Sequence, residues 1–301
     1  MIHYFLRAVG FSGIRKREDI RRLVNDVVQN ADGVSRVTDE EEDVPYGVFY
    51  KQYAKGTGIA VCGSFDENGA FLYDYYVPYV TSEDITTSEE VSVERLSSHV
   101  AYEGLVDETR VGVSLIFYLR NMTDFMEHAA RGRSALKGAE TSLSALSDGG
   151  TIIMPVMKTL QERRITRKKA VSRYRMIADA KKGNEEAMES LTLEDMDTYT
   201  AVSKKIHESD VFTLVDTYFM PFGVECDHYS VLGEILQCHA EENPYSKETI
   251  FVMKLLCNDL TFDLAVNAAD LTGEPKKGRR FKGNIWMQGA IRYPGSEKPR
   301  F

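Results

Sequence analysis

Five basic side chains stand within seven consecutive positions near the end of the chain. They are Lys276, Lys277, Arg279, Arg280 and Lys282. Arginine and lysine donate charge-assisted hydrogen bonds to phosphate and carboxylate groups. The segment 276–282 is therefore a candidate binding loop for a small anionic molecule. The alternative is a solvated hairpin whose charges pair with acidic neighbours, which is the commoner role of a surface charge run.

The same segment approaches the phosphate-binding motif G-x-x-x-x-G-K-[ST], starting at Gly273. Arg279 and Arg280 replace the lysine and the hydroxyl of that motif, and Pro275 removes a backbone N–H. The residues that follow alternate like a strand, whereas the motif requires a helix. The sequence therefore excludes this motif and retains only a basic loop.

Two histidines, His228 and His239, are the candidates for acid–base chemistry beside such an anion. Cys226 and Cys238 lie close to them, but the C-x-H and C-H spacings are unusual for a structural zinc site. In a strand, Cys238 and His239 would also point to opposite faces. We therefore predict no metal. The absence of G-x-S-x-G and H-E-x-x-H lowers the expectation of an enzyme without ending it.

Residues 158–182 contain ten basic and two acidic side chains, a local charge of +8. A basic helix face neutralises phosphates, which is the chemistry of nucleic-acid binding. An apolar stripe at helical spacing predicts instead that this helix docks on its own protein. The net charge of the chain, −9, also argues against nucleic acid as a partner.

Composition and cysteine usage indicate a globular protein of the cytoplasm. The chain has 301 residues, of which 43% are hydrophobic and 28% charged. We find no signal-peptide core and no run of eighteen apolar residues, so we expect neither secretion nor membrane association. Four scattered cysteines are too few for a disulfide framework, which fits a reducing compartment.

Hydrophobic periodicity predicts the elements that would position these side chains. Helices are expected near 16–31, 122–130, 158–182 and 193–208, the last with Thr192 as its N-cap. Strands are expected near 47–54, 57–64, 69–79, 91–103, 110–121, 210–219, 229–242, 248–257, 260–268 and 280–291, with an Asn-Gly turn at 68–69 and a hairpin over 142–154 that turns at 147–150.

These elements predict an α+β fold of two tandem halves, 1–157 and 158–301, each an antiparallel sheet with covering helices. The second half would open with the basic helical segment. Residues 99–115 match residues 239–255 at four positions at an offset of 140, which suggests an internal duplication. The alternative is that two antiparallel meanders look alike by pattern alone.

Several segments of the chain also match a known family. The segments 4–11, 110–119, 215–227 and 278–283 resemble a domain-of-unknown-function family from anaerobic Gram-positive bacteria, and the resemblance runs along essentially the whole chain. The family has no assigned activity, ligand or catalytic residues. The resemblance therefore implies a bacterial cytoplasm and supplies no site.

The sequence leaves the function unknown and favours one hypothesis over two others. The leading hypothesis is a non-catalytic cytoplasmic binding or scaffold protein, with an unknown protein or a small anionic ligand as its partner. The first alternative is an enzyme or sensor for a small phosphate- or carboxylate-bearing molecule at the 276–282 loop. The second is nucleic-acid binding through residues 158–182. No cofactor is expected, and the sequence gives no oligomeric state.

Overall fold

The computed structural model of the chain describes residues 2–39, 44–96, 100–108, 110–111, 113–129, 136–155, 171–173, 175–180, 182–193, 196 and 215–295. Its elements are η1 (Tyr4–Val9), α1 (Arg17–Gln29), β1 (Gly33–Asp39), β2 (Val44–Ala54), β3 (Thr57–Phe65), β4 (Phe71–Val80), β5 (Val91–Arg95), β6 (Tyr102–Glu108), β7 (Val113–Leu119), α2 (Met122–Ala129), β8 (Glu140–Ile153), β9 (Tyr218–Pro221), β10 (His228–Glu242), β11 (Thr249–Cys257), β12 (Leu260–Asn267), η3 (Ala268–Asp270), β13 (Leu271–Thr272) and β14 (Arg280–Arg292). The fold is therefore α+β and consists mostly of strands.

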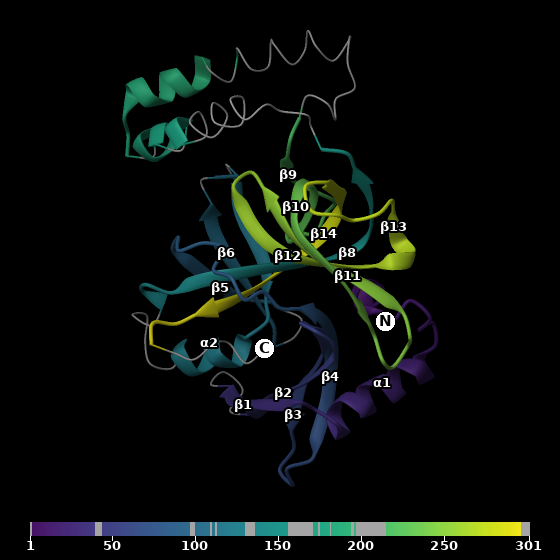
Figure 1. Cartoon of the computed structure of the whole chain (residues 1–301). Helices are drawn as coiled ribbons and strands as arrows, with labels where there is room; N and C mark the ends of the chain where they lie inside the picture. The colour runs from purple at the N-terminus through teal and green to yellow at the C-terminus, as the bar shows by residue number, and fades with distance from the viewer. Residues whose placement is uncertain are drawn as a thin grey trace.

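Strands β1–β4 form an antiparallel sheet, here called sheet A. The Asn-Gly turn joins β3 to β4 as predicted, because Gly69 adopts the positive φ of +78° that this turn requires. Helix α1, also predicted, buries Ile20, Leu23, Val24 and Val27 in a cluster with β3 and β4. Figure 1 shows α1 beside this sheet, below the remaining strands.

The second sheet closes on itself. Strands β8, β12, β11, β10 and β14 pair in that order, and β14 pairs back to β8, so five strands form a barrel. The other edge of β14 continues through a short parallel pairing to β7 and then to β6 and β5. Strand β14 therefore belongs both to the barrel and to its extension.

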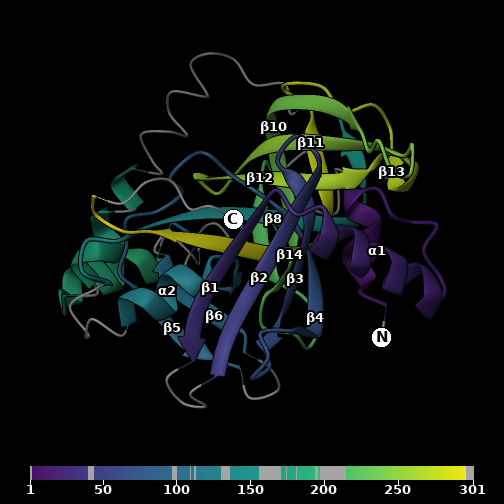
Figure 2. The ribbon, with the colours of Figure 1, turned by 90° about the horizontal axis from the view of Figure 1, so that it is seen from below.

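Sheet A packs against the barrel along a surface that we call the seam. The amide nitrogen of Gln288 donates to the Pro78 carbonyl at 2.8 Å, and the backbone N–H of Val80 donates back to the Gln288 amide oxygen at 3.3 Å. Ser144 of β8 donates to the Val80 carbonyl at 2.6 Å. Seen from below, β1–β4 cross in front of β8 and β14 (Figure 2). The end of β4 is thus fixed on the start of β8 and the end of β14.

The hairpin predicted over 142–154 is wrong, because β8 is one continuous strand. Its glycines serve close packing rather than a turn. A Cβ atom on Gly150 would lie 2.3 Å from the Phe281 ring of the neighbouring strand β14. A glycine inside a strand commonly marks such a close approach.

The two predicted halves do not each form a sheet of their own. Strands β7 and β8, which precede residue 158, pair with β14 and β12, which follow it. The β8–β12 and β7–β14 pairings are parallel, and the β8–β14 pairing is antiparallel. The duplication is not shown either. The offset of 140 aligns β6 with the turn at 243–248, so the matched residues differ in secondary structure.

The basic segment and the helix after it are described only in part. Residues 171–173, 175–180 and 185–193 are helical, whereas 158–170 and 197–214 lie outside the described residues. The N-cap predicted at Thr192 is wrong, because Thr192 lies inside a helix and donates to the Met188 carbonyl. The cap is Asn184, whose side-chain oxygen accepts from the Ala187 N–H at 3.1 Å.

Candidate functional site

The predicted basic loop has an acidic partner within itself. Lys276 Nζ lies 2.8 Å from a carboxylate oxygen of Glu274, and Arg279 Nη1 donates to the Glu274 carbonyl at 2.7 Å. Lys277 is exposed, and Lys282 is half-buried on β14. These contacts favour the interpretation of 276–282 as a solvated turn over that of an anion-binding loop.

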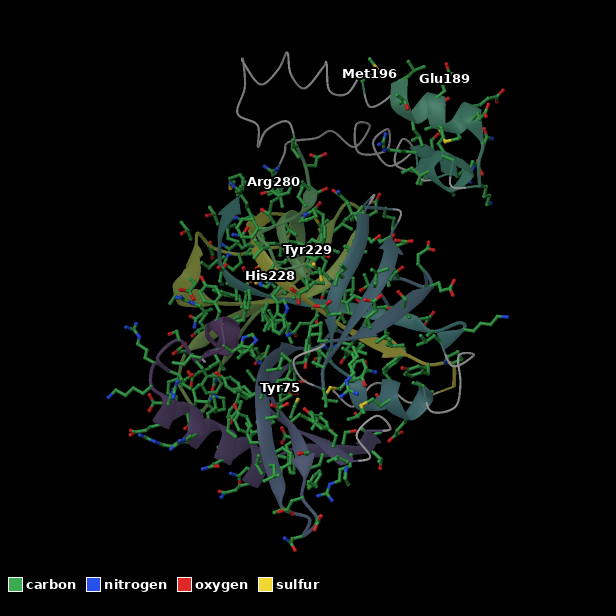
Figure 3. The ribbon with its side chains drawn as sticks, turned by 180° about the vertical axis from the view of Figure 1, so that it is seen from behind. Tyr75, Glu189, Met196, His228, Tyr229 and Arg280 are labelled. Atoms are coloured by element: carbon green, nitrogen blue, oxygen red, sulfur yellow. The ribbon has the colours of Figure 1, made fainter. Side chains whose placement is uncertain are left out.

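Arg280, the first residue of β14, is buried and surrounded by backbone carbonyls. Its Nε and Nη2 donate to the Met154 carbonyl at 3.0 and 2.9 Å, and its Nη1 donates to the Val215 carbonyl at 2.8 Å and the Asp216 carbonyl at 3.4 Å. Figure 3 shows Arg280 at the end of the barrel far from sheet A. Its guanidinium joins β14 to the end of β8 and to the segment before β9.

The structure does not bring the two predicted histidines to this loop. His228 pairs with Trp286 in the β10–β14 ladder, six residues along β14 from Arg280, which is about 20 Å at the rise of a strand. His239 is exposed further along β10, with its Nε2 3.8 Å from a Glu241 carboxylate oxygen. The predicted site residues therefore do not converge on one ligand.

His228 belongs instead to a cluster that we call the N-terminal hook, made of His3, Phe5, Asp227, His228 and Trp286. Asp227 uses both carboxylate oxygens in it: one lies 3.0 Å from His228 Nδ1, and the other accepts from Trp286 Nε1 at 2.5 Å. The His3 ring lies 4.9 Å from the Trp286 ring, and Phe5 stacks on Trp286 at 5.6 Å. The start of the chain is thus attached to the barrel.

The electrostatics of the hook also favour a structural role. Burial lowers the pKa of His3 to about 4, and the nearby His228 contributes in the same direction. His3 is therefore neutral at pH 7, and its Nδ1 accepts a hydrogen bond from the Phe5 N–H. Among the residues that the structure describes, no group of three or more His, Cys, Asp or Glu side chains could hold a metal ion.

A different set of polar residues meets at the other end of β14. The backbone N–H of Arg120, just after β7, donates to the Gly289 carbonyl at 2.8 Å. This contact and the ladder registers place Ala290 between Arg120 on one side and Ser142 of β8 on the other. Arg292 lies two residues beyond Ala290, on the same face of β14.

This face points to the seam. Arg120 is in phase with Tyr118, whose hydroxyl lies 3.3 Å from the hydroxyl of Tyr75 on β4. Ala290 is in phase with Gln288, whose side chain bonds to β4. Tyr79 of β4 lies close enough to the Arg120 guanidinium to raise the pKa of that group. The set thus lies between the barrel extension and sheet A.

Several polar atoms of this set are buried without a hydrogen-bond partner. They are Nε and Nη1 of Arg120, Nε of Arg292, and the hydroxyls of Thr141 and Ser142. Arg120 is 2% exposed, Thr141 0% and Ser142 1%. Arg120, Arg292 and Ser142 lie on the face of Ala290, and we call these three residues the arginine corner; Thr141 pairs with Ile291 and points to the other face of β8. Buried donors are nearly always paired in folded proteins, so unpaired donors gathered at one corner need an explanation.

The corner also carries positive charge without a matching negative charge. Burial lowers the pKa of Arg120 to about 10, Tyr79 opposes this change and the charge of Arg292 adds to it. Arg120 therefore stays charged at neutral pH. Arg292 Nη2 donates to the carbonyls of Ser82 and Glu83. Within the described residues, no carboxylate forms an ion pair with either guanidinium.

Sequence reasoning missed the arginine corner. One signal was present: Arg120 ends the predicted strand run 110–121, in phase with the aromatic side chain of Tyr118. An arginine in the inward phase of a strand needs partners. Its proximity to Arg292, however, depends on the pairing of β7 with β14, and no local pattern predicts that pairing.

Two further expectations concern nucleic acid and membranes. Of the segment 158–182 that would bind nucleic acid, residues 158–170, 174 and 181 fall outside the described residues. In the part of the chain that the structure describes, no helix is both long and apolar enough to cross a membrane.

Comparison with known proteins gives one match. The model of a family described as "Domain of unknown function, E. rectale Gene description (DUF3881)" matches residues 6–289. No curated protein and no solved structure matches the chain. The matched range includes Arg120, Thr141 and Ser142 and ends just before Arg292.

Proposed function

Because the chain belongs to the DUF3881 family, whose description names no activity, we propose its function from its own geometry: a non-catalytic binding protein that encloses a small molecule at the arginine corner. The observation that carries the proposal is Arg120, which is 2% exposed and has two nitrogen atoms without partners. A buried charge without hydrogen bonds costs several kcal/mol, and a bound ligand removes that cost.

The acid–base groups elsewhere support the non-catalytic part of the proposal. The carboxylate of Asp227 is occupied by Trp286 and His228, and the rings of His3 and Phe5 cover this cluster. A general acid or base must reach the proton that it transfers in a bound substrate. The N-terminal hook therefore serves attachment of the chain better than it serves catalysis.

The experiment is a thermal-shift screen of dialysed protein with small charged and uncharged metabolites. A ligand at 100 times its dissociation constant adds about 2.7 kcal/mol, which raises the melting temperature of a chain of this size by about 4 °C. We expect at least one compound to do so in the wild type and not in Arg120→Met. Mass spectrometry should recover that compound unchanged after incubation.

Two results would contradict the proposal. If no compound raises the melting temperature, the proposed binding site does not exist. If the ligand is converted into a product, the protein is an enzyme and the non-catalytic part of the proposal is wrong. Arg279→Met serves as the matched control, because it removes the same charge from the exposed loop where Arg279 bonds only to Glu274 among the contacts given above.

The proposal places the protein in the cytoplasm. The four cysteines, Cys62, Cys226, Cys238 and Cys257, are all free thiols, and Cys226 is exposed. Unpaired thiols fit a reducing compartment. Fractionation of cells that express the protein should recover it with cytosolic markers, and recovery with secreted or envelope markers would contradict this part.

A further inference from the structure

Within the described residues, no carboxylate forms an ion pair with the arginines of the corner, and Glu140 is the acidic residue opposite Arg292 in the ladder. Arg120 is buried, Arg292 lies on the same face of β14, and the charge of Arg292 acts unfavourably on Arg120. Two like charges in a water-poor environment repel more strongly than on a surface. Natural folds seldom retain such a pair unless an opposite charge joins it, since an isolated buried charge is among the costliest groups in a protein.

The unpaired atoms are mainly donors. Arg120 Nε, Arg120 Nη1 and Arg292 Nε can only donate, and the hydroxyl of Ser142 on the same face can donate or accept. Nε and Nη1 lie on different edges of one guanidinium, so a single acceptor atom does not satisfy both. A group with several oxygen atoms does, and it has no donor that would compete with the arginines.

The surroundings limit the size of the ligand. The side chain between Arg120 and Ser142 is only a methyl group, that of Ala290, which is 1% exposed. Gln288 precedes Ala290 on the same face of β14, and its side chain is hydrogen-bonded to Pro78 and Val80 of β4. Arg120 and Ser142 are almost fully buried. A ligand at the corner must therefore be compact, because protein atoms cover these side chains closely.

We propose that the ligand of the arginine corner is a small oxyanion, either a phosphate-type ion or a carboxylate, held by Arg120 and Arg292 with the hydroxyl of Ser142. This inference rests on the proposed function, because it names the chemical class of the enclosed molecule. Guanidinium groups favour both kinds of anion, since each presents oxygen atoms to several N–H donors.

Isothermal titration of the dialysed full-length protein tests the inference. The probes are inorganic phosphate, sulfate and succinate at constant ionic strength, and they separate the two sources of the oxyanion. We expect one class to bind to the wild type, and Arg120→Met to weaken that binding at least 100-fold. Arg279→Met removes the same charge from the exposed loop and should leave the affinity within twofold.

Two milder variants keep the test valid if Arg120→Met does not fold. Ser142→Ala removes one hydroxyl without a change of charge and should weaken binding about fivefold. Arg120→Lys keeps the charge and loses Nε, so its affinity should lie between those of the wild type and Arg120→Met. An equal loss in Arg279→Met, or no loss in Ser142→Ala and Arg120→Lys, would overturn the inference.

The outcomes also separate this inference from the function on which it rests. An uncharged compound that stabilises the wild type and not Arg120→Met would keep the enclosed binding site and overturn the oxyanion. A protein that responds to no compound, charged or uncharged, has only water at the corner, and both proposals fall.

Discussion

A buried arginine lies at each end of β14, and the two arginines differ in their hydrogen bonding. At the first residue, Arg280 is 6% exposed and its guanidinium donates to the carbonyls of Met154, Val215 and Asp216. At the far end, Arg120 beside Ala290 is 2% exposed and has two nitrogen atoms without partners. The arginine that the sequence singled out as a ligand-binding residue is satisfied by the chain, and the one that it missed is not.

The difference arises from where backbone acceptors are free. Val215 and Asp216 lie before β9, outside any strand, so their carbonyls are available to Arg280. Near Arg120 the carbonyls of β14 are already in use: that of Gly289 accepts from the Arg120 N–H, and that of Ile291 accepts from the Asn121 side chain. These backbone carbonyls are therefore already hydrogen-bonded within the chain and are not free to accept from Arg120. A bound ligand or a buried water is the remaining source of oxygen atoms at the corner.

The largest effect is expected from Arg280→Met. The substitution removes the guanidinium donor from the carbonyls of Met154, Val215 and Asp216, and hydrogen bonds to a charged group contribute about 1.5–3 kcal/mol each. We expect the free energy of unfolding to fall by about 3–5 kcal/mol, measured by urea denaturation. A loss below about 1 kcal/mol would mean that this end of β14 is not fixed by Arg280, and the contrast with Arg120 would disappear.

Local sequence patterns predicted elements better than their arrangement. The strands β2, β3 and β4, the helices α1 and α2, and the strands β10, β11, β12 and β14 fall where periodicity places them. The turn predicted at 147–150 failed because Gly150 makes room for Phe281 and Gly149 for Asp270. In a sequence, a glycine can indicate either a turn or a close approach between strands. Only the position of the partner strand distinguishes the two cases.

The candidate site was less predictable than the fold. Arg120 and Arg292 are far apart in the sequence, and they meet because β7 and β14 pair in parallel. Such a pairing depends on the whole topology. The five basic residues of 276–282, in contrast, are obvious in the sequence because they are adjacent, and adjacency in a turn is also what leaves them solvated.

The N-terminal hook is a second region whose buried polar groups are hydrogen-bonded to one another, in contrast to the arginine corner. Its His3 has a pKa lowered to about 4 from 6.5, so the unfolded chain binds a proton more readily than the folded one. Stability should therefore fall as the pH drops from about 6.5 towards about 4, and change little with further acidification on account of this group. The ring keeps some contact with water, so we expect a loss of about 2 kcal/mol.

The measurement is the free energy of unfolding at pH 7 and pH 4.5 in the wild type and in His3→Asn. Asparagine retains an acceptor for the Phe5 N–H and does not titrate in this range, so the variant should lose the part of the pH dependence that His3 supplies. His239→Asn removes an exposed histidine and is the control. If the wild type and His3→Asn show the same pH dependence, the hook is not closed around a neutral imidazole.

Arg120→Met should have the opposite sign from Arg280→Met. Without ligand, it removes a buried charge that nothing in the described chain balances, and apolar replacements of buried charges are often neutral or stabilising. We expect dialysed protein to gain about 1 kcal/mol in the free energy of unfolding, and to lose its response to the ligand. A destabilisation like that of Arg280→Met would show that Arg120 has structural partners and that the two ends of β14 are alike.

The smallest effect is expected from Arg279→Ala, one residue before Arg280. The Arg279 side chain is 28% exposed, and it donates to the carbonyl of Glu274 within the same turn. An exposed ion pair contributes at most about 1 kcal/mol, and its worth falls with salt. We expect a loss of about 0.5 kcal/mol by urea denaturation, reduced further in 0.5 M salt, and an unchanged response to phosphate and succinate. A large loss of anion affinity in this variant would return the ligand to the 276–282 loop, because the only charge removed lies there, and the corner would then need a structural explanation.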